Sequence, residues 1–185
     1  DKITISISGD ITTGFKKKIV PFEILHEVVC SPKFKYSAGT FKKGYRKKDN
    51  YEEKQNLIII DIDENMKLST AKLMFSNYKC MIATTKSHQI EKNGVVCDRF
   101  RIIFITDRTI KLNSEIYSQF MGNVYESLGI PADTSCRDSA RFYYGATGEH
   151  WYSDGEKLFE ISDLIPDTTK DKERKIMLSS TGIDS

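Results

Sequence analysis

The sequence lacks any apolar run close to the ~18–20 residues that a helix needs to cross a bilayer. It also lacks an apolar leader segment, because polar and apolar side chains alternate over residues 1–10. Internal repeats and low-complexity stretches are absent as well. These absences exclude a membrane-spanning helix and a repeat architecture, so we expect no membrane partner.

Cysteine is sparse, and its four copies are scattered at Cys30, Cys80, Cys97 and Cys136. No CxxC pair is present, and the three histidines do not cluster near the cysteines. Zinc ribbons and fingers need closely spaced ligands, so we predict no structural zinc. Nothing indicates an oxidising compartment, and free thiols in a cytoplasm are expected.

What remains is a globular composition of 185 residues, with 39% hydrophobic and 29% charged side chains. That length supports one well-cored domain, with room for a small lobe. We expect the domain to span residues 1–165, followed by a linker or the start of a further region over 166–185. The first residue is not Met and the end is polar, so we expect the chain to be a domain of a longer protein.

Hydrophobic periodicity predicts mixed helices and strands, hence an α+β fold. The apolar run 57–60 is typical of a central strand that is buried on both faces. We expect Ser69 to cap a helix that runs to about residue 77, and Asn113 or Ser114 to begin the clearest helix, which ends at Gly129. The other predicted elements are strands 3–7, 80–84, 100–105 and 140–145, a short helix 22–29, a loop or irregular hairpin 33–56, and a hairpin 150–161 with its turn at Asp154-Gly155.

Positive charge gathers between Lys16 and Lys48, where ten Lys or Arg face only two acids, Glu23 and Glu27. Such a segment fits either a polyanion or an ordinary solvated surface. Within it, aromatic side chains alternate with cations that we predict to bind template phosphates: Lys42, Lys43, Arg46, Lys47 and Lys48.

Two carboxylates end the apolar strand in the sequence LIIIDID, at Asp61 and Asp63. Alternate residues of a strand share a face, which places the two about 6–7 Å apart along the backbone. Like charges at this spacing are reasonable if a divalent cation lies between them, and oxygen ligands favour Mg²⁺ or Mn²⁺. An acidic strand end that faces water is the equally open alternative.

Polar groups suited to a triphosphate follow the next strand, in the sequence TTKSH. Lys86, Ser87 and His88 offer a cation, a hydroxyl and a ring N–H. Strand 100–105 then places Arg99 and Arg101 on one face, which fits either polyanion binding or a solvated face. The segment after the long helix adds more charges to this set: Asp133, Arg137, Asp138 and Arg141. Tyr143 and Tyr144 follow on alternate faces, and one of them could stack on a base.

The order of these motifs between about residues 56 and 145 resembles the archaeo-eukaryotic primase superfamily. The similarity is greatest to the primase-polymerase domains of phage and plasmid primase-helicases. LIIIDID resembles the first motif and TTKSH the second. The third corresponds to PADTSCRDSARF, with Asp133 in the acid position and Arg141 eight residues on.

The resemblance implies an N-terminal α/β unit and an RRM-like catalytic sheet, with the active site in the cleft between two lobes. It implies template-directed nucleotidyl transfer from (d)NTPs, with two Mg²⁺ or Mn²⁺ ions. The implied metal ligands are Asp61, Asp63 and Asp133, and the implied nucleotide ligands are His88, Ser87, Lys86, Arg141 and Arg101. A DNA template, single-stranded or primed, would be the partner, with a helicase domain in the same full-length chain. The location would be the cytoplasm of a bacterial or archaeal host that carries a mobile element.

Two departures from the family pattern affect the assignments. Ser87 is adjacent to His88, where the family has an intervening residue, so the hydroxyl role falls to either Thr85 or Ser87. Asp138 competes with Asp133 as the third acid. We favour Asp133, and we interpret Asp138 as a salt-bridging acid that orients Arg141.

Two other functions compete with the polymerase. A haloacid-dehalogenase-like phosphatase would use Asp61 as nucleophile and Asp63 as general acid, but it expects Thr or Val where this chain has Asn65, and a DxD nearer the N-terminus. A nucleic-acid-binding domain without catalysis is the third possibility.

Overall fold

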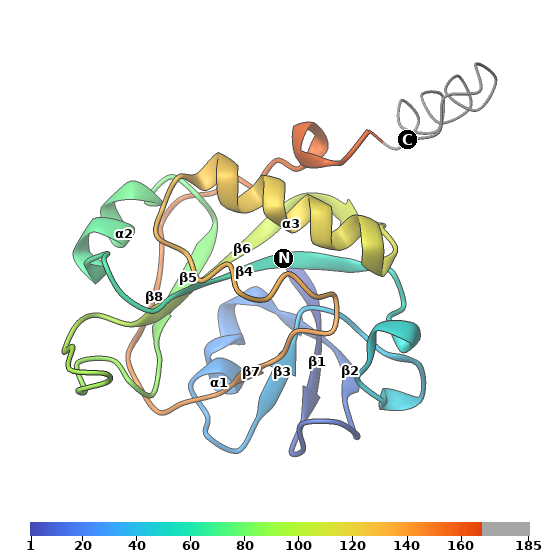
Figure 1. The fold of residues 1–185 in the computed structure, drawn as a ribbon, viewed down its shortest axis with the longest axis horizontal. Coiled ribbons are helices and arrows are strands. Elements are labelled where there is room, and N and C mark those ends of the chain that lie inside the picture. Colours follow the sequence, from blue (N-terminus) through green and yellow to red (C-terminus); the bar gives the residue numbers. More distant parts are fainter. Residues whose placement is uncertain (168–185) are drawn as a thin grey trace, which may run out of the picture.

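The computed structural model describes residues 1–167. Two antiparallel four-stranded sheets lie face to face, and the longest helix covers the outer face of one of them (Figure 1). This arrangement confirms the α+β class. Residues 168–185, most of the expected linker, lie outside the described part.

The first sheet has the strand order β2-β1-β3-β7. It is built mainly from the N-terminal third of the chain, and only its last strand comes from far along the sequence. Its strands are β1 (Lys2–Ser8), β2 (Lys16–Pro21), β3 (Lys35–Ser37) and β7 (Tyr143–Tyr144). Strand β2 was missed by the sequence analysis because its three consecutive lysines hide the alternation. It is an edge strand, where lysine is a common guard against further pairing.

The second sheet has the strand order β4-β6-β5-β8. Its strands are β4 (Gln55–Ile62), β5 (Cys80–Thr84), β6 (Phe100–Ile110) and β8 (His150–Tyr152). Because β6 lies antiparallel between β4 and β5, the unit that includes the two helices is a split β-α-β arrangement of the RRM-like kind. The apolar strand β4 is buried on both faces as predicted, but it lies at the edge of the sheet rather than at its centre.

Two hydrophobic cores explain why β4 is apolar throughout. One core lies between the two sheets and includes Leu57 and Ile59, while the other lies under the helices and includes Ile58 and Ile60. Successive side chains of a strand point to opposite faces, so a strand covered on both sides needs apolar residues at every position. The sheets therefore share one core between them.

Helix α3 (Ser114–Leu128) begins and ends as its sequence predicts. The Asn113 side chain accepts a hydrogen bond from the Ile116 N–H at 2.9 Å, and Gly129 adopts a left-handed φ of 61°. Helix α2 (Leu68–Met74) differs from the prediction, because Ser69 lies inside its first turn. Its N-terminal N–H, on Leu68, donates instead to Asp98 at 2.7 Å. A cap from a distant loop cannot be recognised from local sequence.

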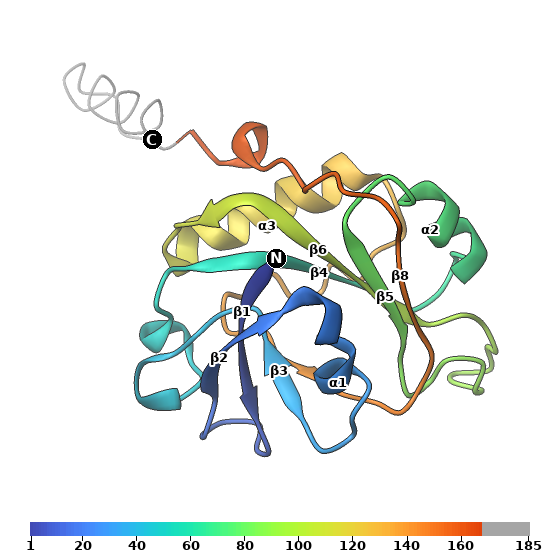
Figure 2. The same cartoon turned by 180° about the vertical axis from the view of Figure 1, so that it is seen from behind.

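The short segment after Pro21 forms a 3₁₀ turn, Phe22–Ile24, and helix α1 (His26–Val29). This helix approaches β8 on the back of the molecule (Figure 2), where Tyr152 Oη lies 3.0 Å from the His26 backbone nitrogen. The remaining 3₁₀ turns are Lys42–Gly44, Lys48–Asn50 and Ser162–Leu164.

The predicted hairpin at Asp154-Gly155 is wrong. Residues 150–152 pair with β5, whereas Lys157 and Phe159 form parallel bridges to Tyr78 and Thr106. Gly155 is required for a different reason: a Cβ there would collide with the Asn77 backbone. Across residues 1–167, no helix is long and apolar enough to cross a membrane.

Candidate active site

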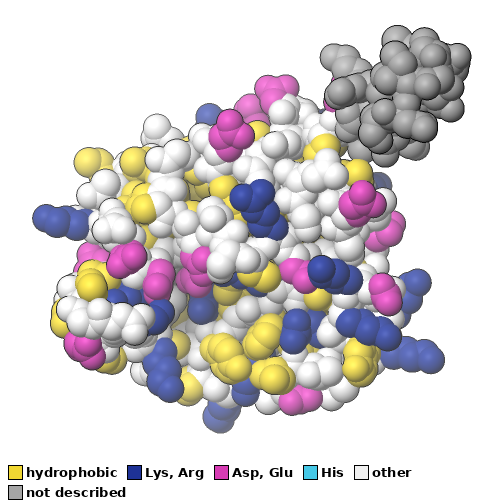
Figure 3. Space-filling view, in the orientation of Figure 1, with side chains coloured by type: hydrophobic (Ala, Val, Ile, Leu, Met, Phe, Trp, Pro, Cys, Tyr) yellow, Lys and Arg dark blue, Asp and Glu magenta, His cyan; other side chains and the backbone are white. Residues whose placement is uncertain are grey.

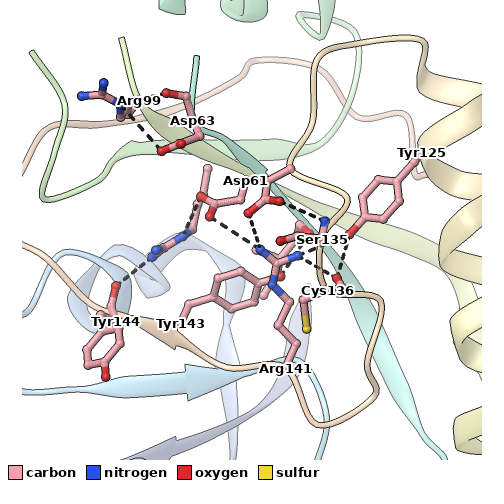
Figure 4. A network of polar contacts seen from close by, with 12 residues as sticks. Asp61, Asp63, Arg99, Tyr125, Ser135, Cys136, Arg141, Tyr143 and Tyr144 are labelled. Atoms are coloured by element: carbon pink, nitrogen blue, oxygen red, sulfur yellow. Dashed lines mark hydrogen bonds and ion pairs between the residues drawn. The ribbon is translucent and has the colours of Figure 1, made fainter. Parts of the chain in front are cut away.

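The central group of the site is Asp61, the last inward-facing residue of β4. Its register partner on β6 is Arg101, and the two side chains meet with Arg101 Nε 3.2 Å from Asp61 Oδ1. The other oxygen, Oδ2, lies 3.6 Å from Arg141 Nη2 (Figure 4). Asp61 is therefore held by one cation from each side, at the open end of the space between the sheets.

Asp133 lies next to Asp61 because of a backbone contact. Its N–H donates to the Asp61 carbonyl at 2.8 Å, along the free edge of β4, and its Oδ2 is 3.6 Å from Arg141 Nη2. Burial alone would raise the pKa of Asp133. Hydrogen bonds from Ser135 and the charge of Arg141 outweigh burial and lower that pKa.

One aromatic ring supports both arginines. The guanidinium carbons of Arg101 and Arg141 each lie 4.9 Å from the centroid of the Tyr143 ring. Tyr143 is buried between the sheets, and burial raises its pKa well above the ordinary value. Such cation–π contacts are stronger away from water, so the ring fixes the positions of both cations.

Asp63 has a more open environment than Asp61. Its side chain is 49% exposed, and its Oδ1 lies 2.9 Å from Lys92 Nζ. Lys92 comes from a small hairpin that the sequence analysis missed, in which Lys92 pairs with Val95. The signal was present, because Asn93-Gly94 is the usual turn of such hairpins, and both residues have positive φ, at 53° and 80°.

Arg99 does not present a cation to solvent, which corrects the expected cationic face of β6. Its side chain is only 3% exposed. Its guanidinium donates to backbone carbonyls at 2.7–3.0 Å, on four residues from the end of β4 and from the loop after β5: Asp63, Ser87, Ile90 and Val95. Arg99 therefore connects two segments: the loop that carries Lys86, Ser87 and Lys92, and the strand end that carries Asp63.

His88 is oriented by the same loop. The Arg99 backbone N–H donates to His88 Nδ1 at 3.0 Å. In the neutral ring the proton therefore lies on Nε2, which leaves Nε2 as a hydrogen-bond donor.

An open cavity of about 660 Å³ lies where these elements meet. Both aspartates of the DxD and a set of cations and hydroxyls line it, whereas His88, Asp133 and Arg141 do not. The opposite wall consists of Pro32 and the end of β7 with the residues that follow. Apart from Tyr144 and Thr147 of that wall, the charged and hydroxyl-bearing lining residues are Asp61, Asp63, Thr85, Lys86, Ser87, Lys92 and Arg101.

The donor set fits one divalent cation better than two. Asp61 and Asp63 offer carboxylate oxygens to the same cavity, which suits Mg²⁺ or Mn²⁺. Within residues 1–167, however, no three His, Cys, Asp or Glu side chains are grouped as a metal site requires. Arg141 Nη2 lies between Asp61 and Asp133, so the expected three-carboxylate centre for two ions is not assembled in this arrangement.

Asp138 lies away from this centre. Its carboxylate accepts from the Ala140 N–H at 2.7 Å and lies 3.3 Å from Lys48 Nζ. Only its backbone carbonyl contacts Arg141, through the Arg141 N–H. The expected role of the Asp138 carboxylate in orienting Arg141 is therefore wrong: Tyr143, Tyr125 and Cys136 perform it.

The basic segment is only partly available for a ligand. Arg46 donates from Nε to the Ile11 carbonyl and from Nη1 to the Ala140 carbonyl, both at 2.7 Å. Lys48 pairs with Asp138. Arg46 is therefore engaged within the fold, and Lys48 is exposed but paired, while Lys42, Lys43 and Lys47 are the other exposed basic residues of this segment.

No protein-family model matches the sequence, and no curated protein matches it. Among solved structures, the chain is similar to the AEP domain (PP-N190) of the cyanophage S-2L primase-polymerase (PrimPol). The sequence identity is 10% and the TM-score 0.48, over 89% of this chain and 90% of that one.

Proposed function

We propose that this domain is a template-directed primase-polymerase that transfers nucleotidyl groups from (d)NTPs. One observation carries the proposal: Asp61 and Asp63 open into the same cavity as Lys86, Ser87, Lys92 and Arg101. Carboxylates that can hold a cation, beside cations and a hydroxyl that can hold phosphates, are the groups that phosphoryl and nucleotidyl transfer need.

The contacts of the cavity-lining residues suggest a separate role for each of them. Lys86, Ser87 and Lys92 lie on the loop that Arg99 holds, and they would bind the triphosphate at the cavity wall. Arg101 would stabilise negative charge that develops at the reacting phosphate, because it lies at Asp61 and in the cavity lining. Lys92 would exchange its contact with Asp63 for a phosphate oxygen when nucleotide enters.

Asp61 and Asp63 would hold a divalent cation. When bound, such an ion supplies a Lewis acid for the phosphate oxygens. Arg141 would then neutralise the remaining charge of Asp61 and Asp133, which it contacts at equal distances of 3.6 Å.

The phosphatase alternative is weaker on sequence, because that family expects Thr or Val at the position of Asn65 and a DxD nearer the N-terminus. The binding-domain alternative is favoured by one observation, the lack of a three-carboxylate group among residues 1–167.

A primer-extension assay separates the three functions. The protein is incubated with a labelled primed template, dNTPs or NTPs, and Mg²⁺ or Mn²⁺, and in parallel with a generic aryl phosphate. Template-dependent extension that stops with a chelator supports the proposal. Hydrolysis of the aryl phosphate alone supports the phosphatase, and DNA binding without either reaction supports the binding domain.

A further inference from the structure

Aromatic rings and cations lie in a row on the outer face of the first sheet and on the loop 45–47 beside it. Apolar and basic side chains gather there over β3 and β7, on the face shown in Figure 3. Residues 35 and 45–47 contribute to this aromatic–cationic row, together with residues 142–144 from far along the sequence. Its members are Lys35, Tyr144, Phe142, Arg46, Tyr45 and Lys47.

Each member of the row contacts the next or adjoins it in the chain. Lys35 Nζ lies 5.9 Å from the centroid of Tyr144, whose ring is 5.3 Å from that of Phe142. The Arg46 guanidinium lies 4.1 Å from the Phe142 centroid. Tyr45 is the neighbour of Arg46 in sequence, and Lys47 Nζ lies 5.1 Å from its ring.

The register of β7 explains why this row faces outward. Tyr143 pairs with Tyr36 and both point into the core between the sheets. Tyr144 pairs with Lys35, so these two side chains point to the other face. The sequence could not say which tyrosine was exposed, and the structure identifies Tyr144.

The middle of the row is fixed and its ends are open. Arg46 is held by two backbone carbonyls at 2.7 Å and by the Phe142 ring. Tyr144 and Tyr45, near the two ends, are 55% and 42% exposed. Tyrosine is enriched at binding interfaces, because its ring is apolar and its hydroxyl is polar, and both of these rings lie beside a cation.

One end of the row adjoins the candidate active site. Arg101 Nη1 donates to the Tyr144 carbonyl at 2.7 Å, while Arg101 Nε is 3.2 Å from Asp61 Oδ1. A ligand that lies along the row would therefore reach the cavity at Tyr144, whose backbone carbonyl Arg101 holds.

We propose that the aromatic–cationic row binds single-stranded nucleic acid, with bases stacked on Tyr144 and Tyr45 and phosphates beside Lys35 and Lys47. Alternating stacking platforms and cations are the recognition mode of single-strand binding, because every base has a π-face and every nucleotide a charge. Duplex bases are already stacked on each other, so the tyrosines contribute only to unpaired strands. This inference rests on the proposed function in one respect: it takes the strand bound at the row to be the template.

The test is a binding titration without nucleotide or metal, on a labelled oligo(dT) of roughly 16 nucleotides. We expect Tyr144→Ala and Tyr45→Ala each to weaken binding about tenfold and Tyr144→Phe to retain it, since stacking needs only the ring. Lys35→Gln should reduce the slope of log K against log salt by about 0.7. Leu73→Ala and Lys111→Gln serve as matched controls, because both are exposed and lie off the row.

Three results would overturn the inference: no binding of the wild type, unchanged binding by both Ala variants, or an equal loss on a duplex of the same length. Circular dichroism of each variant checks that the fold is retained. The readout is independent of catalysis, so wild-type protein that binds oligo(dT) through the tyrosines but extends no primer would refute the proposed function and leave this inference standing.

Discussion

The backbone N–H of Asp133 donates to the carbonyl oxygen of Asp61 at 2.8 Å, although 72 residues separate them along the chain. This bond lies on the edge of β4 that faces away from β6. Backbone groups set the placement of the two acids, so either carboxylate can be changed while the other remains in position. The site can therefore be tested one charge at a time.

We expect Asp61→Asn and Asp63→Asn each to reduce nucleotide incorporation at least about 10²-fold, because each removes charge stabilisation from the reacting phosphate. Asp61→Asn should also cost about 1–3 kcal/mol of stability, since Arg101 and Arg141 lose a partner at a mostly buried position. Asp63→Asn should cost much less, because Asp63 is half exposed. Primer extension and thermal melting measure the two effects. Glu64→Gln, an exposed neighbour, is the control, and near-normal extension by both aspartate variants would contradict the assignment.

Arg99→Leu should destabilise the loop that binds the triphosphate. The substitution leaves four backbone carbonyls without their donor, and one unsatisfied buried acceptor costs about 1–3 kcal/mol. We expect a lower Tm and a KM for nucleotide raised more than kcat is lowered, because Arg99 positions the loop and does not line the cavity. Arg99→Lys should recover part of the Tm. An unchanged KM in a folded Arg99→Leu protein would argue against a positioning role.

His88→Ala should raise the KM for nucleotide more than it weakens DNA binding. The Arg99 N–H occupies Nδ1, so only Nε2 is left to donate, and one N–H suits one phosphate group better than a whole strand. Steady-state incorporation and a DNA-binding titration supply the two values. Equal losses in nucleotide KM and in DNA binding would indicate that His88 has only a structural role.

Asp133→Asn should reduce single-turnover incorporation more than Asp138→Asn does. Asp133 shares Arg141 with Asp61, so its loss changes the charge around the reacting centre. Asp138 pairs with Lys48 and caps the Ala140 N–H, so its loss affects the loop instead. The comparison is made at saturating nucleotide and Mg²⁺ with two substitutions that keep volume. A dead Asp138→Asn beside an active Asp133→Asn would reverse the assignment of the third acid.

Stability should fall as pH drops from about 7 to about 5. The rings of His26 and His150 are stacked 4.3 Å apart, and burial together with the charge of His26 lowers the pKa of His150. A lowered pKa means that the unfolded chain binds more protons than the folded one below about pH 6.5, so the free energy of unfolding decreases there with falling pH. Thermal melts across this range, with His150→Gln as the comparison, measure the effect. An identical Tm difference between the two pH values in wild type and His150→Gln would refute the contribution of His150.

Much of the local structure was readable from sequence because local patterns determine it. The period and caps of α3, from Asn113 to Gly129, match the structure. The apolar run of β4 also predicted burial on both faces. The Asn93-Gly94 turn is a local signal of the same kind, and the hairpin that positions Lys92 could have been predicted from it.

Contacts between distant segments were not readable. Local patterns are enough for the α+β class and for the positions of Asp61 and Asp63 at a strand end, because strand burial and the two-residue period are local properties. The burial of Arg99 and the contact between Asp133 and Asp61 depend instead on how distant segments pack. The same is true of the outward-facing Tyr144 and of Tyr143, which supports two arginines. Each of these depends on sheet register and on loops that close over long sequence separations, for which a single sequence contains no local signal.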